Sequence, residues 1–141
     1  MFYKHKNITL EALNLRLKNT LASTLGMEVV EFGLEHLVMK MPVDHRTIQP
    51  MGVLNGGASL ALAETVGSLA ANLTLDETKV CMGLDINANH IKSASTGFVL
   101  GKAVPLHIGS RTQVWEIKIS DQQHHLICIA RLTLFVIDKP N

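Results

Sequence analysis

The stretch from Gly57 to Leu75, GASLALAETVGSLAANLTL, decides the fold. Its one charged side chain is Glu64, and its apolar residues run all round a helix rather than along one stripe. Other elements must therefore cover this helix on most sides. The stretch has the length of a membrane span, but Glu64 at its middle and several Ser, Thr, Asn and Gly residues favour the buried helix of a soluble protein.

Short segments of alternating apolar residues lie on both sides of this helix. Two precede it, at Met27 to Phe32 and His36 to Met41, and they pair across Gly33 as a hairpin. Four follow it, at residues 80–89, 98–106, 112–119 and 126–137. Antiparallel strands joined by short turns form a twisted sheet that curls around one helix, which predicts an α+β fold. A cystatin-like arrangement is the alternative, although there the helix normally precedes most strands.

The regions before the buried helix divide into a helix and a long loop. Thr9 can cap a surface helix that ends near Gly26 and whose apolar stripe is Leu10, Leu13, Leu17 and Leu21. The segment PVDHRTIQPMGVLNGG, residues 42–57, has two prolines and three glycines and is long for a connection. Loops of this length often carry function.

Composition narrows the class of protein. The 141 residues contain no repeat or linker, which predicts a single domain over residues 1–141. Hydrophobic residues make up 47% and charged residues 18%, as in a globular protein. Thirteen Lys and Arg against twelve Asp and Glu are scattered along the chain, and only 4% of residues are aromatic. The sequence therefore disfavours nucleic-acid binding.

Two further features concern the compartment. Cys81 and Cys128 stand alone, without a Cys or His at metal-ligand spacing, so neither a metal site nor a disulfide is expected. The N-terminal MFYKHKNITLEAL has no apolar export region and no small-residue cleavage site. We expect a cytoplasmic protein with reduced thiols and no membrane contact.

Glu64 is the strongest candidate for chemistry. An ionised carboxylate among apolar side chains is unfavourable unless it is paired or solvated, and no basic residue occurs between Arg46 and Lys79. Glu64 is interpreted as a nucleophile or general base. The alternative is a structural carboxylate in a polar part of an oligomer interface. Ser68 lies four residues on, so it shares the helix face and can orient the carboxylate or a water, unless it bonds its own helix.

The turn Asn55-Gly56-Gly57 is the second candidate. Backbone N–H groups at the start of a helix point outward at the positive end of its dipole, which favours an anion or oxyanion site. A tight turn alone is the alternative. Gly57 and Glu64 are seven residues apart, roughly 10 Å along a helix, too far to contact the same carbonyl group. We therefore expect the oxyanion donors and the carboxylate of one site to come from different chains.

Three segments together resemble the hotdog-fold acyl-CoA thioesterases. They are MPVDHRTIQPMGVLNGGASLALAETVGSLA at 41–70, GLDINANHIKSA at 83–94 and PLHIGSRTQVW at 105–115. The resemblance extends over residues 8–136 and is to the branch containing the menaquinone-pathway 1,4-dihydroxy-2-naphthoyl-CoA thioesterase and the enterobactin proofreading thioesterase. It implies a curved antiparallel sheet around a long buried helix, homodimers with a continuous sheet, and homotetramers made of two dimers.

The resemblance also implies roles for individual residues. Glu64 is then the catalytic carboxylate, the Gly56 N–H polarises the thioester carbonyl, and Gln49 and Ser68 assist with substrate or water. Coenzyme A contacts carry over to Gly83, His90, Ile91, Lys92, Ser93, His107, Ile108, Gly109, Ser110, Arg111 and Thr112. Among these, Lys92 and Arg111 are the cations expected to meet phosphate groups. No metal is implied, and coenzyme A enters only as part of the substrate, so no cofactor is expected.

Asn55 stands where the family has histidine in a His-Gly-Gly sequence. Asn can donate a hydrogen bond but cannot become a cation. Natural tuning, a member that binds without turnover, and an engineered change all remain open. The sequence predicts hydrolysis of a coenzyme A thioester with an aromatic or bulky acyl group. A catalytically weak acyl-CoA binding protein is the alternative, a dehydratase is disfavoured by the missing loop histidine, and a structural oligomer predicts no coenzyme A affinity.

Overall fold

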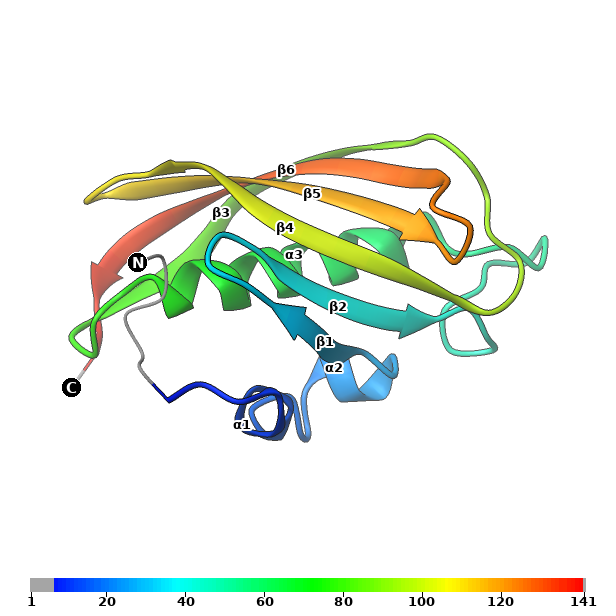
Figure 1. The fold of residues 1–141 in the computed structure, drawn as a ribbon. Helices are drawn as coiled ribbons and strands as arrows, with labels where there is room; N and C mark the ends of the chain where they lie inside the picture. The colour runs from blue at the N-terminus through cyan, green and yellow to red at the C-terminus, as the bar shows by residue number, and fades with distance from the viewer. Residues whose placement is uncertain (1–6, 141) are drawn as a thin grey trace.

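Six antiparallel strands form one continuous sheet in the computed structural model, which describes residues 7–140 (Figure 1). The sheet order is β1-β2-β4-β5-β6-β3. The strands are β1 (Glu28–Phe32), β2 (Leu37–Pro42), β3 (Lys79–His90), β4 (Phe98–Ile108), β5 (Thr112–Asp121) and β6 (Leu126–Asp138). Three helices accompany them: α1 (Leu10–Leu15), α2 (Leu21–Thr24) and α3 (Gly56–Leu73). The α+β prediction is confirmed, in the hotdog arrangement rather than the cystatin-like one.

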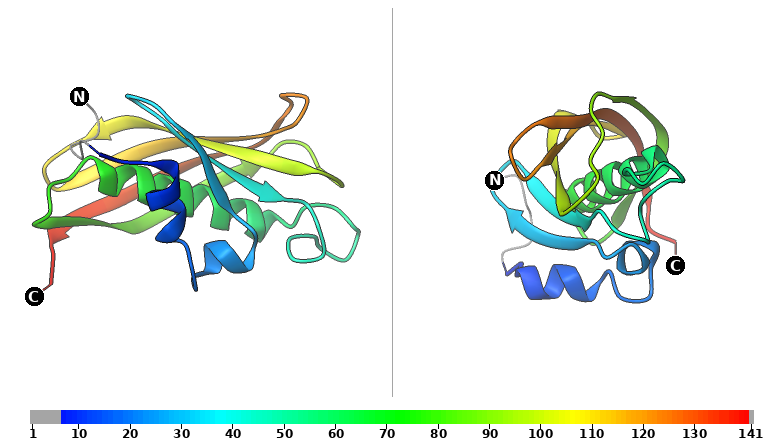
Figure 2. Two further views of the ribbon diagram at one scale, coloured as in Figure 1. Left: turned by 60° about the horizontal axis from the view of Figure 1, so that its bottom comes forward. Right: turned by 90° about the vertical axis from the view of Figure 1, so that its right-hand side faces the viewer.

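The helix α3 lies along the concave face of the sheet, as the two views of Figure 2 show. Leu62, Val66 and Ala70 are completely buried, and they pack in one core with Trp115 and Leu132 of the sheet. The expected burial of α3 on most sides is confirmed, since only Gly57 and Glu64 of this helix are exposed. These two residues lie on one narrow face that the single chain leaves uncovered.

The expected N-terminal helix is interrupted, so the prediction of one continuous helix to Gly26 is wrong. After α1, Asn19 adopts a left-handed conformation with φ of 60°. Thr20 then caps α2 in a capping box with Ser23. The side chain of Asn14 exchanges two hydrogen bonds with the backbone of Val29, at 2.8 and 2.9 Å. Asn14 thereby covers part of the edge strand β1.

The strand β3 does not alternate as its sequence predicts. Its pairing with β6 shifts between Gly83 and Asp85, which adds one residue to β3. Before the shift Cys81 is buried, and after it Ile86 and Ala88 pack against the core, while Met82 and Leu84 are exposed. The expectation that Val80, Met82, Leu84, Ile86 and Ala88 share the buried face, opposite Cys81, is therefore wrong.

The other edge of the sheet is formed by β3. At its start, Asn72 of α3 exchanges two hydrogen bonds with the backbone of Cys81, at 2.9 and 3.1 Å. Beyond Cys81, no other strand of the described residues lies along this edge. An uncovered strand edge is a template for pairing with another chain.

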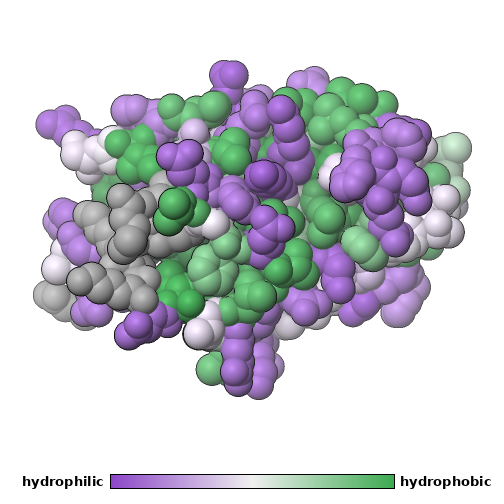
Figure 3. All heavy atoms as spheres, viewed as in Figure 1, coloured by the Kyte–Doolittle hydropathy of each residue, from purple (hydrophilic) through white to green (hydrophobic). Residues whose placement is uncertain are grey.

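The surface mixes polar and apolar side chains. On the face drawn in Figure 3, hydrophilic and hydrophobic residues are interspersed. Within residues 7–140, no helix is long and apolar enough to cross a membrane. The expectation about export was drawn from residues 1–13, and the first six of these lie outside the described residues.

Candidate active site

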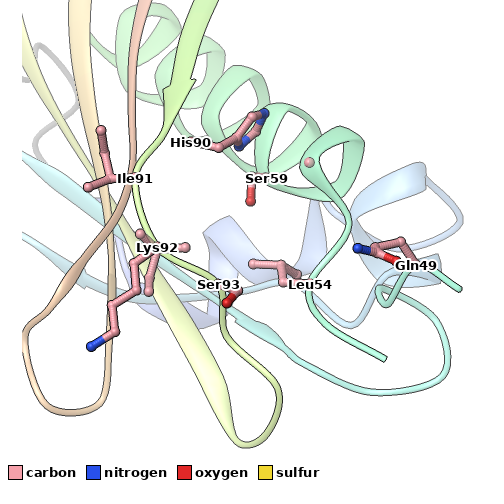
Figure 4. Close-up of a pocket in the computed structure, with 9 residues that line it drawn as sticks. Gln49, Leu54, Ser59, His90, Ile91, Lys92 and Ser93 are labelled. Carbon is pink, nitrogen blue, oxygen red and sulfur yellow. The ribbon is translucent and has the colours of Figure 1, made fainter. Parts of the chain in front are cut away.

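A cavity of about 290 Å³ opens at the start of α3 (Figure 4). Four parts of the chain line it: the loop before α3, the first turn of α3, the end of β3 with the residues that follow, and the start of β6. Its lining residues are Gln49, Leu54, Gly56, Ser59, His90, Ile91, Lys92, Ser93 and Ile127. The structure thus brings together six of the residues that the sequence nominated, namely Gln49, Gly56, His90, Ile91, Lys92 and Ser93.

The long loop before α3 is held by its own hydrogen bonds. The hydroxyl of Thr47, a buried residue, donates to the Pro42 carbonyl at 2.7 Å, and the Thr47 carbonyl accepts from the Asn55 N–H at 2.8 Å. The Leu54 N–H donates to Ala94 after β3, at 2.7 Å. The Oε1 atom of Gln49 accepts from the Met51 N–H at 2.5 Å. Within residues 7–140 no hydrogen bond engages the amide nitrogen of Gln49, so that group is available to donate.

The first turn of α3 presents a free donor to the cavity. Asn55 is the N-cap, and its Oδ1 accepts from the Gly57 N–H at 2.7 Å. The Gly56 N–H has no hydrogen-bond partner in the described part of the chain. The His90 ring covers Gly56 so closely that a Cβ there would lie 2.8 Å from Nε2. A side chain at this position would have to displace the exposed His90 ring, and the Gly56 N–H stands at the positive end of the helix dipole.

A second cavity, of about 300 Å³, lies beside the same turn and is lined by Asn55 and Gly57 rather than Gly56. Its remaining lining is mostly aliphatic: Leu21, Leu25, Ile48, Ala58 and Ala61, with Arg46 and Thr47. Arg46 forms a two-point ion pair with Asp44, with distances of 2.7 and 3.1 Å. This hydrogen-bonded guanidinium lowers the pKa of the Asp44 carboxyl to about 2. The Arg46 charge is thus already paired.

Glu64 lies halfway along α3, away from the first cavity. Its carboxylate rests against the backbone of β3, since a Cβ on Gly83 would lie 2.3 Å from Glu64 Oε1. The side chain is exposed in the single chain. Ser68 is half-buried on the same helix, but no hydrogen bond joins its side chain to Glu64 within residues 7–140. The role of Ser68 in orienting the carboxylate or a water therefore stays a prediction.

The remaining nominated residues lie at the far end of the molecule. The segment from His107 through Ile108, Gly109, Ser110 and Arg111 to Thr112 forms the turn between β4 and β5. The next residue, Gln113, donates to Thr74 at the C-terminal end of α3, at 2.8 Å. Because α3 has 18 residues and is about 27 Å long, one chain does not bring this turn to the first cavity (Figure 1).

Three lining residues escaped the sequence reasoning. Leu54 and Ile127 are buried apolar residues with no signal that distinguishes them from other core positions. Ser59 carried a usable signal, because it lies three residues after Gly56 and therefore on the same helix face.

Known proteins share this architecture. Residues 51–128 match the family model described as the thioesterase superfamily. The 1,4-dihydroxy-2-naphthoyl-CoA hydrolase of Escherichia coli (strain K12) is 46% identical over 137 residues, which cover 97% of this chain and 100% of that protein. The proofreading thioesterase EntH of Cronobacter turicensis is 46% identical over 132 residues, covering 94% of this chain and 96% of that protein.

A solved structure agrees with these relationships. The crystal structure of a thioesterase from Haemophilus influenzae has a TM-score of 0.95 to this chain at 50% identity, and the alignment covers 98% of this chain and 96% of the other. The predicted resemblance is thereby confirmed at the level of sequence and of fold. The chain belongs to the thioesterase superfamily, and it is an enzyme that hydrolyses thioesters.

Proposed function

We propose that the protein hydrolyses coenzyme A thioesters at a site shared by two chains, with Gly56 from one chain and Glu64 from a second copy. The observation that carries this proposal is the free Gly56 N–H at the start of α3, inside a cavity that also holds Gln49 and His90. Two relatives support it, since one is named a hydrolase of a coenzyme A thioester and the other a thioesterase.

The chemistry follows from the two groups. The Gly56 N–H donates to the thioester carbonyl oxygen and stabilises the negative charge that develops there. In one route the Glu64 carboxylate attacks the carbonyl carbon, the thiolate of coenzyme A leaves, and water then hydrolyses the mixed anhydride to release the acid. In the other route Glu64 removes a proton from a water that attacks the carbonyl carbon, and the thiolate leaves. Gln49 has a free amide donor for the substrate, and Ser68 is proposed to assist the carboxylate or the water in the assembled dimer.

A homodimer is the arrangement that unites these groups. Glu64 and Gly57 lie on the uncovered face of α3, and the uncovered edge of β3 lies next to Glu64. Antiparallel pairing of two β3 edges would run the two α3 helices in opposite directions. The start of one helix would then approach the partner's turn at residues 107–112. Met82, Phe135 and Ile137, all exposed, support a further association of two dimers into a tetramer.

We assign the two parts of the substrate to different surroundings. Coenzyme A is proposed to contact the segment from His90 to Ser93 and, in the dimer, the turn that carries Arg111. Gly83 is proposed to leave room for the Glu64 side chain. The second cavity, with its aliphatic walls and its paired Arg46, suits an uncharged aromatic or bulky acyl group. Coenzyme A needs no companion cofactor in this scheme. The buried thiols of Cys81 and Cys128 fit the reducing cytoplasm that we propose as the compartment.

The experiment is a panel of aromatic, short-chain and long-chain acyl-CoA thioesters, assayed by release of free thiol. Glu64→Ala should lower kcat by about 10³-fold or more while coenzyme A binding persists. The matched control is Glu35→Ala, which removes an exposed carboxylate between β1 and β2. Near-normal turnover of Glu64→Ala would remove this residue from the mechanism.

Binding without turnover remains an outcome of the same panel. Asn55 uses its Oδ1 atom as the helix cap and offers the thioester no cation. The Gly56 N–H is a backbone group, however, and its availability does not depend on the side chain at position 55. We therefore expect hydrolysis, and coenzyme A binding with no hydrolysis of any thioester would contradict the proposal.

A further inference from the structure

Ser59 is an exception among the buried polar residues. Four polar side chains are buried in the described part of the chain: Thr47, Ser59, Thr74 and Gln113. The other three are hydrogen-bonded through their side chains. Ser59 is 2% exposed, and its hydroxyl has no hydrogen-bond partner among residues 7–140. In Figure 4 its oxygen points into the first cavity.

This arrangement adds no side-chain hydrogen bond to the fold. No fully buried side-chain oxygen or nitrogen lacks a partner within residues 7–140, so the unpartnered Ser59 oxygen is accessible from the cavity. Alanine at this position would have a higher helix propensity than serine. Serines inside helices usually bond the carbonyl four residues earlier. Here that carbonyl, of Asn55, accepts from the Ser59 backbone N–H at 3.2 Å and not from its hydroxyl. The hydroxyl is therefore left for a group that enters the cavity.

The position of Ser59 restricts what that group is. Ser59 lies three residues after Gly56 and on the same face of α3, and helix side chains lean toward the N-terminus. Both residues line the first cavity, so the hydroxyl and the free Gly56 N–H face the same space. An oxygen that accepts from both would also lie at the positive end of the helix dipole.

We infer that Ser59 is a catalytic residue that donates a second hydrogen bond to the thioester carbonyl oxygen, beside the Gly56 N–H. This inference rests on the proposed function, because it assigns a further donor to the same reaction. The bond strengthens as negative charge develops on the oxygen, so it stabilises the transition state more than the bound substrate.

The kinetic test is Ser59→Ala, assayed on the best thioester of the panel. We expect kcat to fall on the order of 10²-fold, with KM changed little and the thermal unfolding midpoint unchanged or raised. Thr74→Ala is the matched control, since it removes a buried hydroxyl from the other end of α3. It should lower the unfolding midpoint and leave kcat unchanged. An unchanged kcat in Ser59→Ala, or a raised KM with normal kcat, would overturn the inference.

A binding test needs no turnover and so separates this inference from the proposed function. Two thioethers of coenzyme A are compared: a phenacyl thioether, which keeps a carbonyl group, and a 2-phenylethyl thioether, which lacks it. The wild type should bind the phenacyl compound more tightly, because both donors meet its carbonyl group. Ser59→Ala should reduce this preference by about tenfold, the value of one good hydrogen bond, and keep the part that the Gly56 N–H supplies. Equal preference in both proteins, or no preference in the wild type, would show that Ser59 donates to no carbonyl.

Discussion

Gly83 provides space for the Glu64 carboxylate. In Gly83→Ala the new Cβ would meet Glu64 Oε1 at 2.3 Å, so the flexible side chain must move. Displacement of a reacting group by about 1 Å can reduce the rate on the order of 10²-fold, and we expect such a loss of kcat with the fold intact. Thermal unfolding should show a small loss of stability for Gly83→Ala that disappears in the Glu64→Ala background. A loss of stability that persists in the Glu64→Ala background would show that the new Cβ clashes with a group other than Glu64.

Asn55 caps the helix α3 and also lies beside the Gly56 N–H, and variants at this position should separate the effects on stability and on catalysis. Asp caps a helix as well as Asn does and favours the positive end of the dipole, so Asn55→Asp should keep or raise stability. Its negative charge beside the Gly56 N–H opposes the oxyanion, so kcat should fall. Asn55→His should lose about 1 kcal/mol of unfolding free energy with the cap and raise kcat. If both variants keep the wild-type kcat, the side chain at position 55 plays no part in catalysis.

The ion pair of Asp44 and Arg46 predicts a pH dependence of stability. Hydrogen bonding to Arg46 lowers the folded-state pKa of Asp44 from 3.8 to about 2. The ion pair therefore makes its full contribution to the free energy of unfolding above the pKa that Asp44 has in the unfolded chain. This contribution is lost as the pH falls through the folded-state pKa. Asp44→Asn should lower the unfolding midpoint by a nearly constant amount from pH 7 to about pH 4, and this difference should shrink toward pH 2 and vanish below it. A difference undiminished at pH 2 would exclude this carboxylate as its source.

At the scale of the element, α3 is anchored to the sheet by a buried polar network. The indole of Trp115 donates to Gln113 at 2.9 Å, Gln113 donates to Thr74 at 2.8 Å, and Thr74 donates to the Ala71 carbonyl at 2.7 Å. Gln113→Leu removes two of these bonds and should lower the unfolding free energy by about 1–3 kcal/mol. Chemical denaturation measures the loss, with the exposed Gln123→Leu as control. Equal losses of unfolding free energy in the two variants would show that this network does not anchor α3 to the sheet.

The same scale shows where prediction from the sequence failed. Periodicity identified all six strands and the long helix, because an alternating or all-round apolar pattern depends on local backbone geometry. The interruption between α1 and α2 follows from the left-handed conformation of Asn19, and the identity of this residue alone does not predict that conformation. The shift at Gly83 and Asp85 depends on pairing with β6, so no local pattern in β3 reveals it.

At the scale of the whole molecule, the separation of Gly56 from Glu64 predicts complementation. Gly56→Ala would push a Cβ to 2.8 Å from His90 Nε2 and disturb the donor, whereas Glu64→Ala removes the carboxylate. A dimer with one copy of each variant keeps one intact site when each site draws on both chains. After subunit exchange of equal amounts, we expect about a quarter of the wild-type activity from two inactive proteins. No recovery in verified mixed dimers, or an active monomer in sedimentation, would contradict the shared site.

The sequence by itself determined the order of the elements, the donor turn at the start of the long helix, and the distance from that turn to Glu64. These properties follow from patterns and from the fixed rise of a helix. Only the tertiary structure decided that Ser59 and Ile127 share a cavity with His90, that Glu64 rests on Gly83, and that the turn at 107–112 lies at the opposite end of α3. The physical reason is that these contacts join segments distant in the chain, and their geometry depends on how the sheet curls and where β3 shifts register.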